Sequence, residues 1–242
     1  MSGQHNHRAS FTKEDKNKQK ERAIRILEAA AELIQRWGYR KTTIDDIAKH
    51  AGVAKGTIYL HWKTREELFM DLLIRERMKA GRGIEEQVAA DPEGTTLHGL
   101  IKHSILATLR NPLLKAVILK DADILGELVN SEFGHADTEH RIAAIKTFLE
   151  LLRDRALIRT DIDLDTQFYM LEAITTGFII VDQFLPDRFH VSTEDIAKMA
   201  ADTIQHTFEL HLPTSEDRQE TSTAFEHMLK TERERIQKEI ES

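Results

Sequence analysis

The stretch from Thr42 to Trp62 reads TTIDDIAKHAGVAKGTIYLHW and predicts two short helices separated by a tight turn. Thr43 and Asp46 have the spacing of a capping box, in which each side chain bonds the backbone N–H of the other residue. We therefore expect a helix to begin at this box and to end at the Ala-Gly-Val turn of residues 51–53. Residues 54–60 leave room for a second helix of about two turns.

Two helices joined in this way cross steeply, so the crossing needs a small residue, a permissive turn residue and apolar residues that hold the angle. These roles are filled at suitable spacings by Ala48, Gly52, Val53 and Ile58. The second helix then presents Lys55, Thr57 and Tyr59 outward, and cationic and hydroxyl donors suit phosphates and base edges. The pattern predicts a helix-turn-helix, although Ala-x-x-x-Gly-Val alone also fits an ordinary helical hairpin.

The rest of the chain predicts an all-α protein, because apolar residues recur at helical spacing and no alternating strand pattern is present. Residues 1–19 are polar and are interpreted as a flexible basic arm, residues 20–66 as a three-helix helix-turn-helix domain, residues 67–212 as a larger helical domain, and residues 213–242 as a linker and an extra C-terminal helix. The later helices are expected at about 95–110, 112–130, 137–156, 164–185, 193–211 and 222–240. Capping boxes at Ser192–Asp195 and Thr223–Glu226 support the last two.

The composition indicates a globular protein with the cytoplasm as its expected location. It has 40% hydrophobic and 31% charged residues, with few glycines and prolines, as is typical of helix-rich globular chains. No segment approaches the roughly 18 continuous apolar residues of a membrane span, so no membrane partner is expected. The absence of cysteine excludes disulfides, thiolate nucleophiles and cysteine-bound zinc.

The charge is unevenly distributed along the chain, although the net charge is −7. Residues 1–63 carry 13 Lys and Arg against 7 Asp and Glu, whereas the remainder carries 21 against 34. A basic N-terminal part on an acidic body indicates that the N-terminal part meets a polyanion.

Residues from about 22 to 69 resemble the DNA-binding domain of the tetracycline-repressor (TetR) family nearly position by position. The matching segments are Ile26–Ala30, Trp37–Tyr39, Thr43–Ala48, Ala51–Val53, Lys55–Tyr59 and Arg65–Phe69. The resemblance implies a homodimeric repressor that binds a palindromic double-stranded operator and is released by a small-molecule inducer in its helical body. The alternative is a DNA-binding interaction protein of the same fold, of the nucleoid-occlusion type, that acts through a protein partner without a small-molecule ligand.

The resemblance also implies which residues lie at the DNA surface: Thr43, Lys55, Gly56, Thr57, Tyr59, Leu60, His61 and Arg65. Three positions depart from the family pattern. Ala54 replaces the usual Ser, so the recognition helix should lack a side-chain cap. Leu60 stands where a larger polar or aromatic residue is common, and it offers apolar contact to a thymine methyl but no hydrogen bond. Trp62 replaces the usual Phe, and both Trp62 and Trp37 are expected to anchor the core.

The helices at about 164–185 and 193–211 are the expected dimer interface, again by resemblance. Its expected residues are Phe168, Leu171, Ile174, Gly177, Ile196, Met199, Ile204 and Phe208, which could instead fill the core of a monomer. A ligand cavity is expected among Leu106, Leu109, Leu113, Val117, Phe148, Leu152, Phe178 and Asp182. Asp182 either orients a ligand or lies exposed near Pro186. The extra helix is expected to pack on the body or on a partner subunit.

Other site patterns in the sequence are weak. Residues 161–172 place carboxylates at the spacing of a calcium loop, but Thr166 stands where that loop needs Gly, so Asp163 or Asp165 is expected to cap a helix instead. His98 and His103 are five residues apart, which turns them away from a common helix face. With no phosphate loop, nucleophile elbow or triad, we expect no enzyme activity, metal or cofactor.

Overall fold

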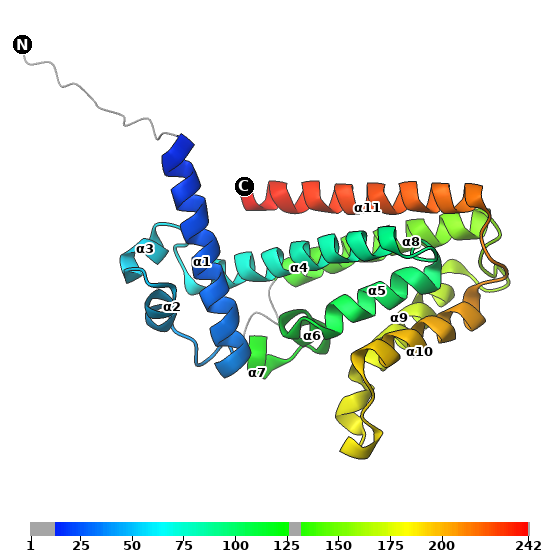
Figure 1. The fold of residues 1–242 in the computed structure, drawn as a ribbon, viewed down its shortest axis with the longest axis horizontal. Coiled ribbons are helices and arrows are strands. Elements are labelled where there is room, and N and C mark those ends of the chain that lie inside the picture. The colour runs from blue at the N-terminus through cyan, green and yellow to red at the C-terminus, as the bar shows by residue number, and fades with distance from the viewer. Residues whose placement is uncertain (1–12, 126–131, 242) are drawn as a thin grey trace, which may run out of the picture. The chain divides into compact units, whose positions relative to one another are not determined.

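The computed structural model describes residues 13–125 and 132–241, which form helices in the order shown in Figure 1. The chain divides into two compact units, Met1–Leu72 and Leu73–Ser242, so the division falls inside helix α4 (Arg65–Ala90), whereas the sequence predicted residue 66. The described residues contain no strand, only an isolated antiparallel bridge between Ile158 and Glu209. The predicted all-α class is confirmed. Within the described ranges, no helix combines the length and apolar character needed to cross a membrane.

The first unit consists of α1 (Lys13–Trp37), α2 (Ile44–Ala51), α3 (Lys55–Tyr59) and the start of α4. Its core is made of buried apolar side chains that include Ile26, Ala30, Leu33, Ile47, Ile58 and Phe69. The prediction of a flexible arm is wrong for residues 13–19, which are helical, while residues 1–12 lie outside the described part. The acidic Glu14 and Asp15 favour this early start, because they interact well with the positive end of the helix dipole.

Tyr39, rather than Trp37, is the aromatic residue that anchors this core beside α1. Tyr39 is 4% exposed and its ring lies 4.8 Å from that of Phe69 in an edge-on arrangement, whereas Trp37 is 42% exposed. Gly38 adopts a left-handed φ of 78° and ends the helix, so that the residue after it packs inward. The prediction that Trp37 anchors the core is therefore wrong, whereas Trp62 is buried as expected.

The second unit contains the rest of α4 and seven further α-helices within the described residues: α5 (Leu97–Leu109), α6 (Pro112–Leu119), α7 (Ala122–Leu125), α8 (Glu132–Asp154), α9 (Leu164–Ile180), α10 (Thr193–Phe208) and α11 (Ser215–Glu241). The single helix predicted at 112–130 is wrong, because Lys120 adopts a left-handed φ of 48° and ends α6. Asp163 caps α9 by accepting from the Thr166 N–H at 2.9 Å, which confirms the expected cap.

The C-terminal helix begins earlier than its predicted capping box at Thr223. The box is formed instead by Thr214 and Asp217, whose side chains bond each other's backbone N–H groups. Thr223 lies inside α11 and donates its hydroxyl to the Gln219 carbonyl. The predicted start at residue 222 is therefore wrong, because a hydroxyl residue three places before a carboxylate also occurs in helix interiors, where it bonds the preceding turn.

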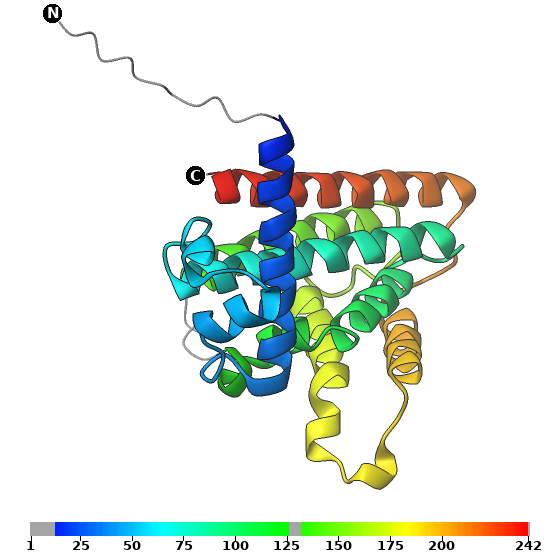
Figure 2. The same ribbon diagram turned by 60° about the vertical axis from the view of Figure 1, so that its left-hand side comes forward.

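α11 packs on the second unit along α4 and α8, as both ribbon views show (Figures 1 and 2). Phe225 is 5% exposed and lies in the main apolar cluster with Val88 of α4 and Phe148 of α8. Ion pairs from α11 to α4 flank this contact, with Arg233 2.6 Å from Glu85 and Arg77 paired with Glu232. The expectation that this extra helix packs on the body is thus confirmed.

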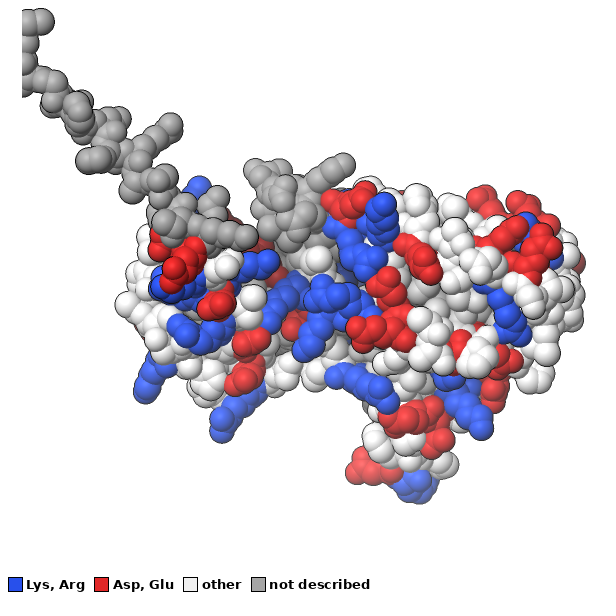
Figure 3. All heavy atoms as spheres, turned by 45° about the horizontal axis from the view of Figure 1, so that its top comes forward, with Lys and Arg blue, Asp and Glu red and all other residues white. Residues whose placement is uncertain are grey.

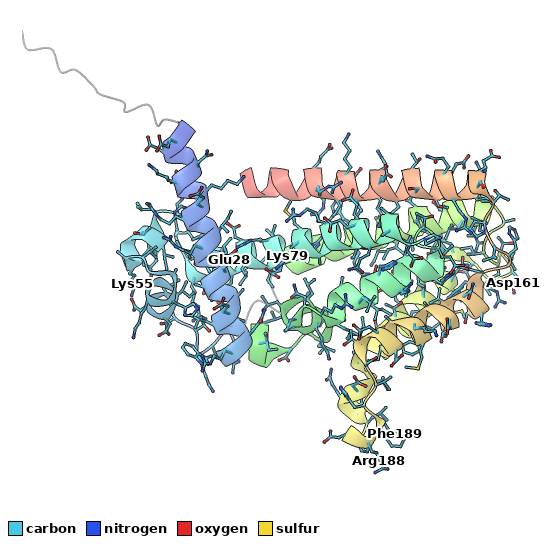
Figure 4. The ribbon with its side chains drawn as sticks, in the orientation of Figure 1. Glu28, Lys55, Lys79, Asp161, Arg188 and Phe189 are labelled. Carbon is cyan, nitrogen blue, oxygen red and sulfur yellow. The ribbon has the colours of Figure 1, made fainter. Side chains whose placement is uncertain are left out.

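The connection between α9 and α10 projects from the rest of the second unit (Figures 1 and 2). It consists of two 3₁₀ turns, η2 (Val181–Phe184) and η3 (Asp187–Phe189). Phe184 is 75% exposed and Phe189 is 51% exposed. Figure 4 shows Phe189 with Arg188 at the end of this projection, where the guanidinium lies 4.8 Å from the centre of the ring.

Candidate nucleic-acid interface

The outer side of α3 and the residues just after it carry most of the predicted DNA contacts, whereas Thr43 and Arg65 lie at the starts of α2 and α4. α2 ends at Gly52, whose left-handed φ of 65° turns the chain, and the Val53 N–H then donates to the Ala48 carbonyl at 2.9 Å. Ile58 is fully buried and holds α3 on the core, which leaves Tyr59 46% exposed and Leu60 76% exposed. The helix-turn-helix therefore buries its apolar side and presents the other to solvent.

Lys55, at the start of α3, is exposed but already has a partner in this surface. Its Nζ lies 2.8 Å from Asp45 Oδ2 on α2, and this hydrogen bond raises the pKa of the lysine above its ordinary value. Figure 4 shows Lys55 on the α2–α3 side of the unit. Sequence reasoning missed Asp45, because an acidic residue in the first turn of a helix is normally explained by the helix dipole alone.

Thr57, Gly56 and His61 complete the expected surface on α3 and just beyond it. Gly56 is exposed, and a Cβ built on it would meet no atom within 4 Å, so its backbone is open to a ligand. Thr57 and His61 are half-buried. Burial lowers the pKa of His61 below its ordinary value, and the positive charge of Arg22 lowers it further, so the ring is neutral at pH 7. A neutral imidazole offers one N–H donor and no charge.

Thr43 is exposed, as expected, but its hydroxyl is used in the capping box of α2. It accepts from the Asp46 N–H at 3.2 Å and donates to Asp46 Oδ2 at 2.6 Å. These hydrogen bonds from Thr43 lower the pKa of Asp46, which keeps that carboxylate charged. The Thr43 hydroxyl has one proton, so it cannot donate to a phosphate while it donates to Asp46 Oδ2.

Arg65 begins α4 half-buried, with its guanidinium over an aromatic ring. The carbon at its centre lies 4.0 Å from the centroid of Tyr39, and Nη1 is 3.4 Å from the Thr42 carbonyl oxygen. The Tyr39 hydroxyl in turn donates to Glu66 at 3.0 Å. Burial raises the pKa of Tyr39, so this hydroxyl keeps its proton. The predicted phosphate donor is therefore held in place by a cation–π contact that no sequence signal indicated.

The structure bears out the predictions that Ala54 gives α3 no side-chain cap and that Trp62 is buried in the core. Ala54 has the extended backbone of an N-cap, with φ −73° and ψ 145°, but makes no side-chain hydrogen bond, so the absent cap is confirmed. The Trp62 indole N–H donates to Asp71 Oδ2 at 2.6 Å, which satisfies the polar end of a buried ring.

Acidic and basic side chains alternate over the face shown in Figure 3, and the exposed cations do not form one continuous patch there.

The residues predicted to line a ligand cavity fall into separate places in the second unit. Phe148 and Leu152 belong to the main apolar cluster, whereas Leu106, Leu109 and Phe178 lie in a second cluster with α10. Leu113 is fully buried, Asp182 is half-buried and Val117 is 44% exposed. Val117 therefore faces solvent in this chain rather than an interior cavity.

A small hollow lies beside the main apolar cluster of that unit, where Thr96, Leu152, Ile158 and Glu209 are among its lining residues. Its cavity volume is about 10 Å³, which is room for about one water molecule. Only Leu152 of the predicted ligand-binding residues takes part in its lining. Among the described residues, no group of three or more His, Asp and Glu side chains is placed to hold a metal ion.

Two buried histidines on α5 bond carboxylates beside this hollow and at the end of α4. His98 Nδ1 lies 2.8 Å from Glu209, and His103 Nε2 lies 2.9 Å from Asp91. Burial opposes the charged form of His98, but the hydrogen bond and charge of Glu209 outweigh it and raise the pKa. Burial likewise opposes the charge of Asp91, but hydrogen bonds, above all from Lys102, lower its pKa to about 2.

Half of the predicted dimer-interface residues are buried inside the protomer. Leu171, Ile196, Ile204 and Phe208 are each at most 5% exposed and pack in the apolar clusters of the second unit. The prediction is wrong for these four, because side chains without exposed surface cannot contact a second chain. Phe168, Ile174 and Gly177 are partly exposed, and Met199 is 40% exposed.

Tyr169 was missed by the sequence prediction, although it lies on α9 two helical turns before Gly177 and is 74% exposed. A Cβ built on Gly177 would meet no atom within 4 Å, so the space beside this part of α9 is open. The signal available in the sequence was spacing: Tyr169, Ala173 and Gly177 recur every four residues and so share one helix face.

Comparison with known proteins gives the first unit a family. Residues 26–72 match the family model for bacterial regulatory proteins of the tetR family. The chain is similar to the uncharacterized HTH-type transcriptional regulator YhgD of Bacillus subtilis (strain 168), with 45% identity over 64 residues, which cover 25% of this chain and 34% of that protein. The chain thus spans about a third of the length of the first curated relatives that it matches.

Solved structures extend the likeness over most of the chain. The TetR-family protein CprB from S. coelicolor A3(2) matches with a TM-score of 0.54 and 22% identity, over 88% of this chain and 98% of that one. The SmeT–triclosan complex matches with a TM-score of 0.56 and 20% identity, over 81% and 96%. At these identities the structures show the fold, and the family match is confined to residues 26–72. Residues 26–72 thus match the tetR family of bacterial regulatory proteins, and the fold of the chain is similar to that of TetR-family structures.

Proposed function

We propose that this protein is a homodimeric transcriptional repressor that binds a palindromic operator through α3 and is released by a small molecule bound in its second unit. The observation that best supports DNA binding is that the helix-turn-helix buries one side and exposes the other. Ile58 is fully buried beneath α3, while Lys55, Tyr59 and Leu60 are exposed above it, within the residues that match the tetR family model. A helix that presents one exposed face in this way suits the major groove.

The proposal is tested by selecting duplexes from random DNA with the full-length protein and then measuring affinity against salt. We expect a palindromic site, with half-sites about one helical turn apart and affinity that falls steeply with salt, because phosphate contacts release counterions. Arg65→Ala should reduce the slope of log affinity against log salt by about one. Lys230→Ala, at an exposed position of α11, serves as the control. Failure to enrich any duplex, or a salt-independent affinity, would contradict DNA binding.

The dimer in this proposal uses the exposed face of α9. Tyr169 and Gly177 supply an apolar surface with open space beside it, as a closely packed two-fold interface needs. Sedimentation equilibrium at micromolar concentration tests the assignment: the wild type should be a dimer, and Tyr169→Glu should shift it towards monomer. Lys230→Glu, at an exposed position of α11, is the charge control. A monomeric wild type would remove the dimer from the proposal.

The small-molecule part of the proposal is supported by the apolar clusters of the second unit and by the fold shared with the SmeT–triclosan complex. Triclosan is a practical first probe, followed by a library of apolar compounds. Each compound is added to the protein–operator complex and scored by loss of DNA binding. An inducer should weaken operator binding by the same factor by which the operator weakens inducer binding.

A second candidate is regulation through a protein partner, and the projection between α9 and α10 favours it. Phe184 and Phe189 are exposed there, and large exposed apolar side chains grouped together are typical of interaction sites. Replacing both by Ser separates the candidates. A repressor released by a small molecule should keep operator binding and release, whereas a partner-dependent regulator should lose regulation in cells while retaining operator affinity in vitro.

A further inference from the structure

We propose that Leu60 selects thymine in the operator by packing against its 5-methyl group. The inference rests on the proposed DNA-binding function and adds to it a specificity-determining residue and the base that it recognises. The thymine methyl is the only apolar group that the four bases present in the major groove. An apolar side chain on a recognition surface therefore has one base with which it is complementary.

Leu60 has the placement that such a contact requires. It is 76% exposed, more than any other large hydrophobic side chain among the described residues. It directly follows α3, and its φ of −74° and ψ of −22° continue the helical direction, so it lies at the C-terminal end of the recognition surface beside Tyr59. The core beneath is closed by Ile58 and Trp62, which are 0% and 5% exposed, so the fold does not use Leu60 for packing.

The chemistry of the neighbouring side chains points in the same direction. Residues 54–61 read AKGTIYLH and contain no Arg, Asn, Gln, Asp or Glu. Side chains that bind guanine or adenine through two hydrogen bonds are thus absent from these residues, apart from the lysine. Side chains that accept a hydrogen bond from cytosine are absent as well. That lysine, Lys55, is paired with Asp45 at 2.8 Å. This surface therefore offers single hydrogen bonds from Thr57, Tyr59 and His61 together with the apolar contact of Leu60.

Gly56 adds room for this approach. It is exposed one helical turn before Leu60, and a Cβ at Gly56 would meet no protein atom within 4 Å. The absence of a side chain lets the backbone of α3 come close to the DNA. Position 56 therefore contributes no side chain that would keep Leu60 from a methyl group in the groove.

The test replaces thymines of the selected operator by deoxyuridine, one symmetry-related pair at a time. The replacement removes the methyl group and leaves every hydrogen-bonding atom. We expect one symmetry-related thymine pair at which this replacement weakens wild-type binding by about fourfold per half-site, the effect of one buried methyl. Leu60→Ala should weaken binding to the unmodified operator to a similar extent. On the deoxyuridine operator, Leu60→Ala should cause no further loss, because the contact is already gone.

The controls separate the possible failures. Leu212→Ala, the same truncation at an exposed leucine of the other unit, should retain wild-type affinity on both operators. Circular dichroism and thermal unfolding establish that Leu60→Ala folds, as expected for an exposed position. If no duplex is enriched at all, the proposed function fails. If the operator binds but no thymine methyl is coupled to Leu60, the function stands and this inference is overturned.

Discussion

At the scale of single residues, the ion pair between Lys55 and Asp45 limits the positive charge that α3 presents on the proposed DNA-binding surface. Both side chains are at least half exposed, at 50% and 67%, so solvent screens the pair and it adds little to folding stability. Its importance is for binding, because Asp45 both neutralises Lys55 and adds a negative charge near the recognition surface. The carboxylate should therefore oppose association with phosphates.

Asp45→Asn is expected to tighten operator binding several-fold and to steepen the salt dependence by about one unit, because Lys55 becomes free to neutralise a phosphate. The measurement is fluorescence anisotropy with the selected operator over a range of salt. Glu32→Gln provides a control, since Glu32 is also exposed and paired, but with His50. Weaker binding by Asp45→Asn would mean that the pair positions Lys55 rather than restrains it.

The uncapped start of α3 predicts a stabilising substitution. Ala54 already has N-cap backbone angles, so Ser at this position can accept from an N–H group of the first turn without a change of conformation. Ala54→Ser should raise the free energy of unfolding by about 1 kcal/mol, measured by urea denaturation. Ala54→Val, which cannot accept a hydrogen bond, should give no such gain. Equal stability of the Ser and Val variants would argue against the missing cap.

At the scale of elements, α11 is an integral part of the second unit rather than an appendage. Phe225 is 5% exposed in the main apolar cluster, so its truncation leaves a cavity. Phe225→Ala should lower the free energy of unfolding by about 3 kcal/mol, measured by urea denaturation. Glu226→Ala, at the exposed neighbouring position, should change it by less than about 0.5 kcal/mol. Similar values for the two variants would show that α11 does not contribute to this core.

At the scale of the whole molecule, buried charged pairs make stability depend on pH. The pKa of His98 is raised above its ordinary value of 6.5 because Glu209, helped by Glu93, outweighs burial. Protonation therefore stabilises the folded state, fully below about pH 6.5, and this contribution is lost as the pH rises through the folded pKa. Asp91 acts in the opposite sense: its contribution is present above about pH 3.8 and is lost as the pH falls towards 2.

His98→Gln is expected to flatten the decrease in stability above pH 6.5, because the variant has no proton to lose at that position. Urea midpoints measured from pH 5.5 to 8.5 for wild type and variant give the comparison. His206→Gln is the control, since His206 is exposed on α10 and bonds a backbone carbonyl instead of a carboxylate. The same pH dependence in wild type and His98→Gln would contradict a protonated His98–Glu209 pair.

The helix-turn-helix could be predicted closely from the sequence, because its determinants are local. The Thr43 capping box, the left-handed Gly52 and the missing cap at Ala54 each depend on residues within one or two turns of the chain. Such short-range patterns fix helix starts and turns before any long-range contact forms. The family resemblance then supplied the surface that these helices present, and the exposed Tyr59 and Leu60 lie on it.

Other features depended on contacts between distant residues, and only the tertiary structure decided them. Arg65 packs over Tyr39, and Lys55 pairs with Asp45 across the turn. Apolar spacing predicted that Leu171, Ile204 and Phe208 face something apolar, but not whether that surface was their own core or a second chain. Periodicity gives the face of a helix that is buried, whereas the identity of what covers it follows from how the helices pack.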